Sequence, residues 1–171
     1  PEFQTFFNES KVVDEKGSPQ VVYHGTDQQF DTFDIGKIGS NFGLDAKGFF
    51  FTTDKDSANR SRASYPDKSK FSFTEEDKIA AQSGNIIAAY VNVKNPLFAK
   101  DIPDFENPGG ISPIGLFDLN RDKIIKQLEG SDADGVIIKA EGSKLVMALT
   151  PEQIKSATDN NGQFNSNNPN I

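Results

Sequence analysis

The stretch Val21-Val22-Tyr23-His24-Gly25-Thr26 joins a short β-branched run to the only histidine of the chain. Valine followed by an aromatic residue favours a strand, and the glycine favours a strand end that opens onto a cleft. The imidazole of His24 offers one ring donor and one ring acceptor. Gly25 lacks a Cβ, so a flat ligand can approach its backbone closely. The stretch predicts a strand that ends at a ligand site, with a purely structural histidine as the alternative.

Length and composition narrow the class of protein. The 171 residues are expected to form one domain, and 15 Phe without any Trp predict a core built on phenylalanine. The net charge of −7 argues against nucleic acid as a partner, because few cations remain to neutralise phosphates. Without cysteine, thiolate catalysis, disulfides and Cys-ligated metal are excluded. No metal site is expected, since there is one His and no carboxylate motif.

The two ends of the chain differ from its middle. The start Pro1-Glu2-Phe3 resembles an expression-vector scar, so residues 1–3 are expected to be foreign. Residues 4–157 are expected to form the single domain. Residues 158–171 form an Asn-rich polar tail that cannot order itself, although it can dock. No stretch reaches the roughly 18 apolar residues of a membrane span, so a soluble protein without membrane contact is expected.

Five short β-favouring runs predict the strands of an α+β domain. Asn95-Pro96 ends the third run, because proline cannot donate to a strand ladder. The last two runs flank residues 139–144 and are expected to pair as a hairpin. The five runs lie at residues 20–23, 48–53, 86–93, 136–138 and 145–149.

Helices and irregular segments complete the predicted domain. Thr53 is expected to cap a helix over residues 54–64. Asn120 is expected to cap a second helix over Arg121–Leu128, which Gly130 ends. Weaker signals predict a small strand at 71–73, a helix over 74–81, a glycine-bearing loop over 27–43 and irregular chain over 102–113.

Four short motifs follow one another along the chain. They are Tyr23-His24-Gly25-Thr26, then Gly48-Phe49-Phe50-Phe51-Thr52 with Ser57-Ala58 downstream, then Asp134-Gly135-Val136-Ile137, and finally residues 150–157 before the Asn-rich end. In this order and spacing they resemble the ADP-ribosyltransferase domains of bacterial and phage polyvalent proteins. These domains are similar in turn to the diphtheria-toxin and poly-ADP-ribose-polymerase branch, which carries a His, a Tyr and a Glu. The resemblance covers residues 21–171.

The resemblance implies an ADP-ribosyltransferase-like split β-sheet with flanking helices and an NAD cleft. It implies a mono-ADP-ribosyltransferase that cleaves NAD between nicotinamide and ribose and transfers ADP-ribose to a macromolecular acceptor, expected to be protein. The transition state resembles an oxocarbenium ion, so the site must stabilise positive charge on the ribose. A monomer of bacterial or phage origin is expected, acting as a toxin or effector in the cytoplasm or in a host cell.

The resemblance also implies roles for individual residues. His24 would bond a ribose hydroxyl on the adenosine side, and Gly25 would bind the nicotinamide amide through its backbone. Phe50 replaces a stacking tyrosine and keeps the aromatic face, while Ser57 matches a hydroxyl that bonds the amide. The expected NAD-binding residues are His24, Gly25, Thr26, Gly48, Phe50 and Ser57, and the expected catalytic residues are His24, Phe50 and Glu141.

The catalytic acid departs from the family pattern. Counting back from Gln153 places the expected glutamate at Lys144 or Leu145, and neither side chain can stabilise positive charge. Glu141 is the nearest acid and the candidate, with an exposed turn residue as the alternative.

Structural roles are the alternative for the other candidates. Strand neighbours alternate sides, so the phenylalanines on either side of Phe50 are expected to pack in the core. Ser57 and Thr26 are alternatively a cap and a turn hydroxyl, and Gly48 alternatively only lets the chain turn.

Two further functions stay open because the family's Glu and Tyr are substituted. One is an NAD-binding pseudoenzyme or NAD glycohydrolase. The other is a non-catalytic interaction module that keeps the fold.

Overall fold

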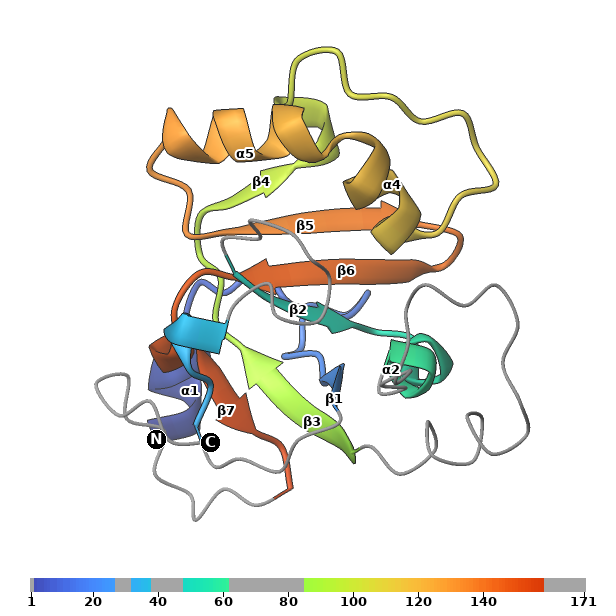
Figure 1. Cartoon of the computed structure of the whole chain (residues 1–171). Coiled ribbons are helices and arrows are strands. Elements are labelled where there is room, and N and C mark those ends of the chain that lie inside the picture. The colour runs from blue at the N-terminus through green and yellow to red at the C-terminus, as the bar shows by residue number, and fades with distance from the viewer. Residues whose placement is uncertain (1, 27–31, 38–47, 62–84, 159–171) are drawn as a thin grey trace, which may run out of the picture.

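The computed structural model describes residues 2–26, 32–37, 48–61 and 85–158, which form a seven-stranded sheet with short helices (Figure 1). The strand order is β4-β5-β6-β2-β1-β3-β7, with β4 and β5 parallel and every other pair antiparallel. The α+β class is confirmed. The strands are β1 (Val22–Thr26), β2 (Phe49–Thr52), β3 (Asn85–Val91), β4 (Pro96–Phe98), β5 (Gly135–Ala140), β6 (Ser143–Ala148) and β7 (Ile154–Ser156).

Short helices join and cover the strands. Figure 1 shows α4 and α5 beside the half of the sheet that holds β4 and β5, and α2 near β1 and β2. The helices are α1 (Glu2–Phe7), η1 (Ile35–Lys37), α2 (Lys55–Ser61), η2 (Ala99–Asp101), α4 (Pro113–Leu119), α5 (Arg121–Glu129) and η3 (Pro151–Gln153). The signals at residues 71–73 and 74–81, most of the loop 27–43 and the tail from 159 onward lie outside the described residues.

The predicted hairpin is confirmed. β5 and β6 pair from Gly135 opposite Ala148 to Ala140 opposite Ser143. The connecting residues Glu141 and Gly142 both have positive φ, 48° and 73°, as a two-residue hairpin turn requires.

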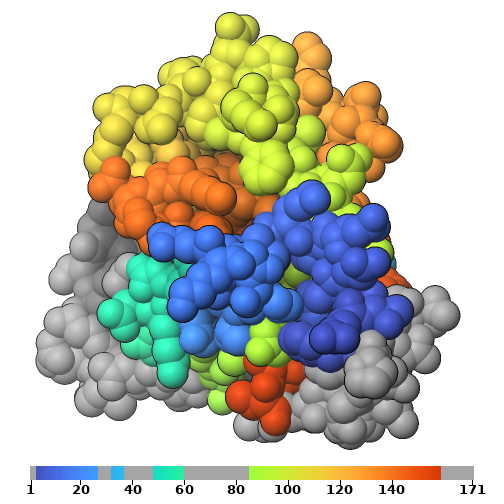
Figure 2. Space-filling model, turned by 180° about the vertical axis from the view of Figure 1, so that it is seen from behind, coloured from blue at the N-terminus to red at the C-terminus, as the bar shows by residue number. Residues whose placement is uncertain are grey.

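Two hydrophobic clusters lie on the two faces of the sheet. Successive strand residues alternate between them: Ile137 of β5 joins the first cluster, while Val136 and Ile138 join the second. The second cluster packs against buried residues of α4 and α5, including Phe117. The first includes Val12 of the N-terminal segment, which lies in blue beside the orange hairpin in Figure 2. Both clusters contain buried phenylalanine, but most of their residues are aliphatic, so the prediction of a core built on phenylalanine was only partly right.

Three predictions of local structure were wrong in part. The helix α2 is capped by Asp54 rather than Thr53, since the Oδ1 atom of Asp54 accepts from the backbone N–H of Asp56 at 3.0 Å. Strand β3 already ends at Val91, before the predicted stop at Asn95-Pro96, and Pro96 begins β4, because the first residue of an edge strand can lack an N–H. The chain over 102–113 is indeed irregular, yet it leads into α4, which the sequence analysis missed.

Asn120 has a structural role other than capping. The predicted helix α5 is confirmed, but no side-chain cap bond is formed at its start. The buried Asn120 amide instead bonds the backbone of Glu106 through both of its polar atoms, at 2.7 and 2.8 Å, and the Leu116 carbonyl at 2.9 Å. It therefore ties the segment after η2 to the corner between α4 and α5.

Gln153 joins three separate segments of backbone. Its Oε1 atom accepts from the N–H groups of Leu149 and Thr150 at 2.9 and 3.0 Å. Its Nε2 atom donates to the carbonyls of Asn92 and Asp134 at 3.0 and 2.8 Å. All four hydrogen-bonding positions of the amide are used, so this residue fixes β3, β5 and the end of β6 relative to one another.

We expect Gln153→Glu to destabilise the fold by about 3 kcal/mol, because a carboxylate would face two backbone carbonyls that it cannot satisfy. Urea unfolding followed by circular dichroism measures this change. Gln127→Glu, on α5, is the matched control and should stay within about 0.5 kcal/mol of the parent. Equal stability of the two variants would contradict a structural role for Gln153.

Candidate functional site

The sheet is nearly divided between β1 and β2. These strands pair at one register position, Tyr23 opposite Thr52. By contrast, β1 pairs with β3 at five positions and β2 pairs with β6 at four. The two halves of the sheet therefore separate just where His24 and Gly25 follow Tyr23. We call this place the split.

His24 bridges the split through its side chain. Its Nδ1 atom lies 2.7 Å from the backbone oxygen of Phe50 on β2. A carbonyl oxygen only accepts, so Nδ1 carries the proton and donates it. In the neutral ring, Nε2 is then a hydrogen-bond acceptor. The bond fixes the tautomer as well as the position of the ring.

The surroundings of His24 keep its ring neutral. Burial lowers its pKa below the ordinary 6.5, and the hydrogen bond to Phe50 opposes this only in part. Two aromatic rings pack against the imidazole, Phe33 at 5.2 Å and Phe51 at 5.5 Å between ring centroids. At neutral pH the side chain therefore presents an acceptor and no charge.

Gly25 turns its backbone toward the split. Backbone groups of successive residues in an antiparallel strand point to opposite neighbours. Ala157 donates to the Ala88 carbonyl at 2.8 Å, so Ala88 faces β7 and Ile87 faces β1. Ile87 pairs with His24, which directs the backbone of Gly25 the other way, toward β2. Within the described residues the β1–β2 ladder has already ended there, so one N–H and one C=O face the split.

The three phenylalanines of β2 divide between the two faces. Phe49 and Phe51 are buried in the first cluster, as predicted. Phe50 is half-buried, and its ring packs edge-on against Phe117 of α4 at 4.9 Å. The ring of Phe50 thus lies on the other face from the ring of His24, and its carbonyl oxygen is the atom that meets the imidazole.

Gly48, Thr26 and Ser57 each have a structural explanation here. A Cβ on Gly48 would overlap the Ala148 carbonyl and approach Met147 Cγ to 2.7 Å. Thr26 is buried at the end of β1. The hydroxyl of Ser57 donates to Asp54 at 2.6 Å, in the first turn of α2. Contacts from these three residues to NAD stay predictions.

The expected carboxylate is not beside His24. Leu145 is 4% exposed in the second cluster, and Lys144 donates through Nζ to Val13 and Gln20, both at 2.6 Å. Glu141 is exposed at the hairpin tip. Ile137 of β5 pairs with Val146 of β6, which pairs with Phe51 of β2, and this row of residues leads across the sheet toward His24. Glu141 lies four residues further along the chain than Ile137. That offset corresponds to about 13 Å along the strand, besides the spacing between strands.

Phe33 contacts His24 and was missed by the sequence analysis. It is 3% exposed and precedes η1. The only sequence signal was a set of spaced aromatic residues inside a glycine-bearing loop, which gives no partner for any of them.

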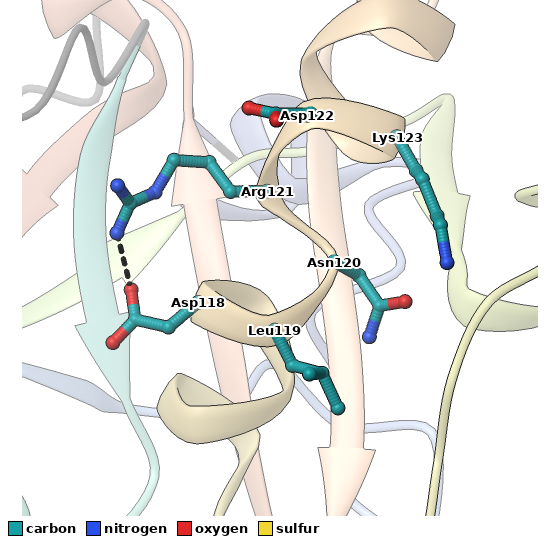
Figure 3. Close-up of a pocket in the computed structure, with 6 residues that line it drawn as sticks. All are labelled: Asp118, Leu119, Asn120, Arg121, Asp122 and Lys123. Carbon is teal, nitrogen blue, oxygen red and sulfur yellow. Dashed lines mark hydrogen bonds and ion pairs between the residues drawn. The ribbon is translucent and has the colours of Figure 1, made fainter.

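A shallow pocket lies elsewhere, at the corner between α4 and α5 (Figure 3). Two ion pairs form at this corner: Arg121 pairs with Asp118 at 2.8 Å, and Lys123 pairs with Glu106 at 2.6 Å. None of the predicted site residues lines it. The lining residues are Asp118, Leu119, Asn120, Arg121, Asp122 and Lys123.

The split sheet is consistent with an ADP-ribosyltransferase-like fold. Residues 14–164 match the family of ADP-ribosyltransferase domains in polyvalent proteins, and the chain belongs to this family. Its general function is therefore ADP-ribosylation. No curated protein and no solved structure matches the chain.

Two absences concern the described part of the chain, residues 2–26, 32–37, 48–61 and 85–158. No helix there is long and apolar enough to cross a membrane. No group of three or more His, Cys, Asp or Glu residues there is placed to hold a metal ion.

We expect acid to destabilise the fold through His24. In the unfolded chain His24 takes up a proton near pH 6.5, whereas in the folded chain its lowered pKa delays protonation. The contribution of His24 to stability is therefore complete above pH 6.5 and falls as the pH drops below that value. The slope should approach about 1.4 kcal/mol per pH unit. Urea unfolding between about pH 7.5 and 5.5 measures it. His24→Gln should lack this slope, and parallel curves for the two proteins would contradict a buried neutral imidazole.

Proposed function

We propose that the chain is a mono-ADP-ribosyltransferase that binds NAD at the split and transfers ADP-ribose to a protein. Family membership supports ADP-ribosylation in general. The observation that carries the finer proposal is the 2.7 Å contact between His24 Nδ1 and the Phe50 carbonyl. It fixes an acceptor on the imidazole directly beside the backbone edge of Gly25.

The proposed contacts match the polar groups of NAD. The N–H of Gly25 donates to the carboxamide oxygen of nicotinamide, and its C=O accepts from the amide nitrogen. The Nε2 atom of His24 accepts from a ribose hydroxyl. The further proposed NAD-binding residues are Thr26, Gly48, Phe50 and Ser57.

The reaction exchanges one bond at the ribose. The bond between ribose C1′ and the nicotinamide nitrogen breaks, and nicotinamide leaves with the electron pair. Positive charge develops on the ribose, and a lone pair of the acceptor then forms the new bond to C1′ while its proton passes to solvent. A carboxylate near the ribose would stabilise this charge, and Glu141 is the proposed group.

Binding of NAD without transfer, or its hydrolysis by water, is a second candidate function. The positions expected for the acid hold a buried Leu145 and a Lys144 already bonded to the N-terminal segment. Glu141 would have to approach from the exposed hairpin tip. A site with the NAD contacts but without a carboxylate would bind the dinucleotide and leave it intact.

The choice of acceptor and setting rests on charge and on the family. The net charge of −7 disfavours nucleic acid, so we propose a protein acceptor. From the family alone we propose a toxin or effector of bacterial or phage origin, acting as a monomer in the cytoplasm or in a host cell.

Incubation with radiolabelled NAD and bacterial extract tests the proposed transfer. Protease-sensitive label on protein is the expected result. His24→Ala should reduce this label about tenfold or more, because it removes the imidazole that accepts a hydrogen bond from the ribose. Free ADP-ribose alone would instead indicate hydrolysis. Calorimetric binding of NAD with neither product would indicate a pseudoenzyme, and absence of binding would overturn both candidates.

Two variants then test whether Glu141 is the acid. Glu141→Gln should reduce transfer about 100-fold if its charge stabilises the ribose, whereas Glu15→Gln, in another exposed turn, should have no effect. If Glu141→Gln keeps full activity, Glu141 is not the acid.

A further inference from the structure

Phe33 connects the two halves of the sheet at the split. Its ring meets the His24 ring edge-on, at 5.2 Å and 75°. It also packs against Phe49 at 5.1 Å and Phe51 at 5.5 Å on the other side of the split. A side chain from outside the sheet thus touches both the imidazole on β1 and the aromatic floor on β2.

The hydrogen bond from His24 to Phe50 does not by itself fix the plane of the imidazole. It sets the position of the Nδ1 atom, but a bond at one atom does not prevent the ring from tilting about it. Phe51 meets the imidazole at 49° and Phe33 meets it at 75°. Contacts with two rings in different planes restrict that tilt, and so they set the direction of Nε2.

We propose that Phe33 is a positioning residue, which holds the plane of the His24 imidazole, thereby preserves the hydrogen bond that fixes its tautomer, and excludes water from the ring. Its effect on NAD binding rests on the function proposed above. Its effect on the imidazole itself does not, so the two can be tested separately.

Among the described residues, two aromatic rings pack against the His24 imidazole. Among described residues, β2 carries no ionisable side chain, and Tyr23 and Tyr90 alternate to the opposite face from His24. Lys55 of α2 lies over the Tyr23 ring, and Asp34 beside Phe33 is exposed. The lowered pKa of His24 has burial as its main cause, and the hydrogen bond to Phe50 opposes it. Removing the Phe33 ring should therefore change the pKa of His24 by letting water reach the imidazole.

Nuclear magnetic resonance can test this directly, because the chain holds one histidine and its ring signals need no assignment among several. The variant is Phe33→Leu, which keeps an apolar side chain and removes the ring. The matched control is Phe7→Leu in α1. It removes another buried ring, which packs against Phe6 of the same helix and Tyr90 of β3. The pKa and tautomer come from ¹⁵N shifts of the imidazole over a pH series.

We expect Phe33→Leu to raise the pKa of His24 toward 6.5 and to mix its two tautomers. NAD affinity, measured by calorimetry, should fall about three- to tenfold. Phe7→Leu should change neither. Unchanged His24 signals in Phe33→Leu, or equal changes in both variants, would overturn the proposal.

A parallel measurement on the parent protein covers the case in which Phe33→Leu does not fold. Nuclear Overhauser contacts between the His24 and Phe33 rings, with protected Nδ1–H exchange, are expected, and their absence overturns the positioning role. If the parent protein does not bind NAD at all, the proposed function fails, while the pKa and tautomer still decide the role of Phe33.

Discussion

The hydrogen bond from His24 to the Phe50 carbonyl is the contact on which the rest of the site depends. Strands β1 and β2 share one paired position, so a side chain rather than a ladder carries the link beyond it. That arrangement has two consequences. The imidazole is fixed as an acceptor at Nε2, and the backbone of Gly25 is released from pairing with β2. A continuous ladder would have satisfied both strands and left no backbone edge for a ligand.

Such a split is stable because each half of the sheet has its own support. On one side, β2 continues into the hairpin of β5 and β6, which α4 and α5 cover. On the other side, β1 pairs along its whole length with β3. Gln153 and Phe33 then hold the halves together from outside the β1–β2 ladder. The first hydrophobic cluster also contains residues of both halves, so the core continues across the place where the β1–β2 ladder ends.

Much of this arrangement could be predicted from local sequence. Two β-favouring runs on either side of residues 139–144 predicted a hairpin, and the order of four motifs indicated the family that the chain belongs to. Features that depend on distant partners could not be predicted. Helix α4 begins at a serine cap followed by proline inside a Pro- and Gly-rich segment, where the helical signal is short. Asparagine is a common helix cap, but the side chain of Asn120 forms hydrogen bonds with the backbone of Glu106 instead.

At the site, the sequence identified His24 and Gly25 but not the direction of their groups. The tautomer of His24 depends on which strand carbonyl it meets, and the orientation of Gly25 depends on where the β1–β2 pairing stops. The position of the proposed acid depends on the register of the hairpin, which places Glu141 at the exposed tip. Residue types predicted an NAD site, whereas pairing between strands determines the geometry of the split.

A crystal structure with a non-hydrolysable NAD analogue tests the central claim most directly. We expect the nicotinamide amide within hydrogen-bond distance of both the N–H and the C=O of Gly25, and a ribose hydroxyl that donates a hydrogen bond to Nε2 of His24. A nicotinamide bound away from the split, or a His24 ring turned so that Nδ1 leaves the Phe50 carbonyl, would contradict it.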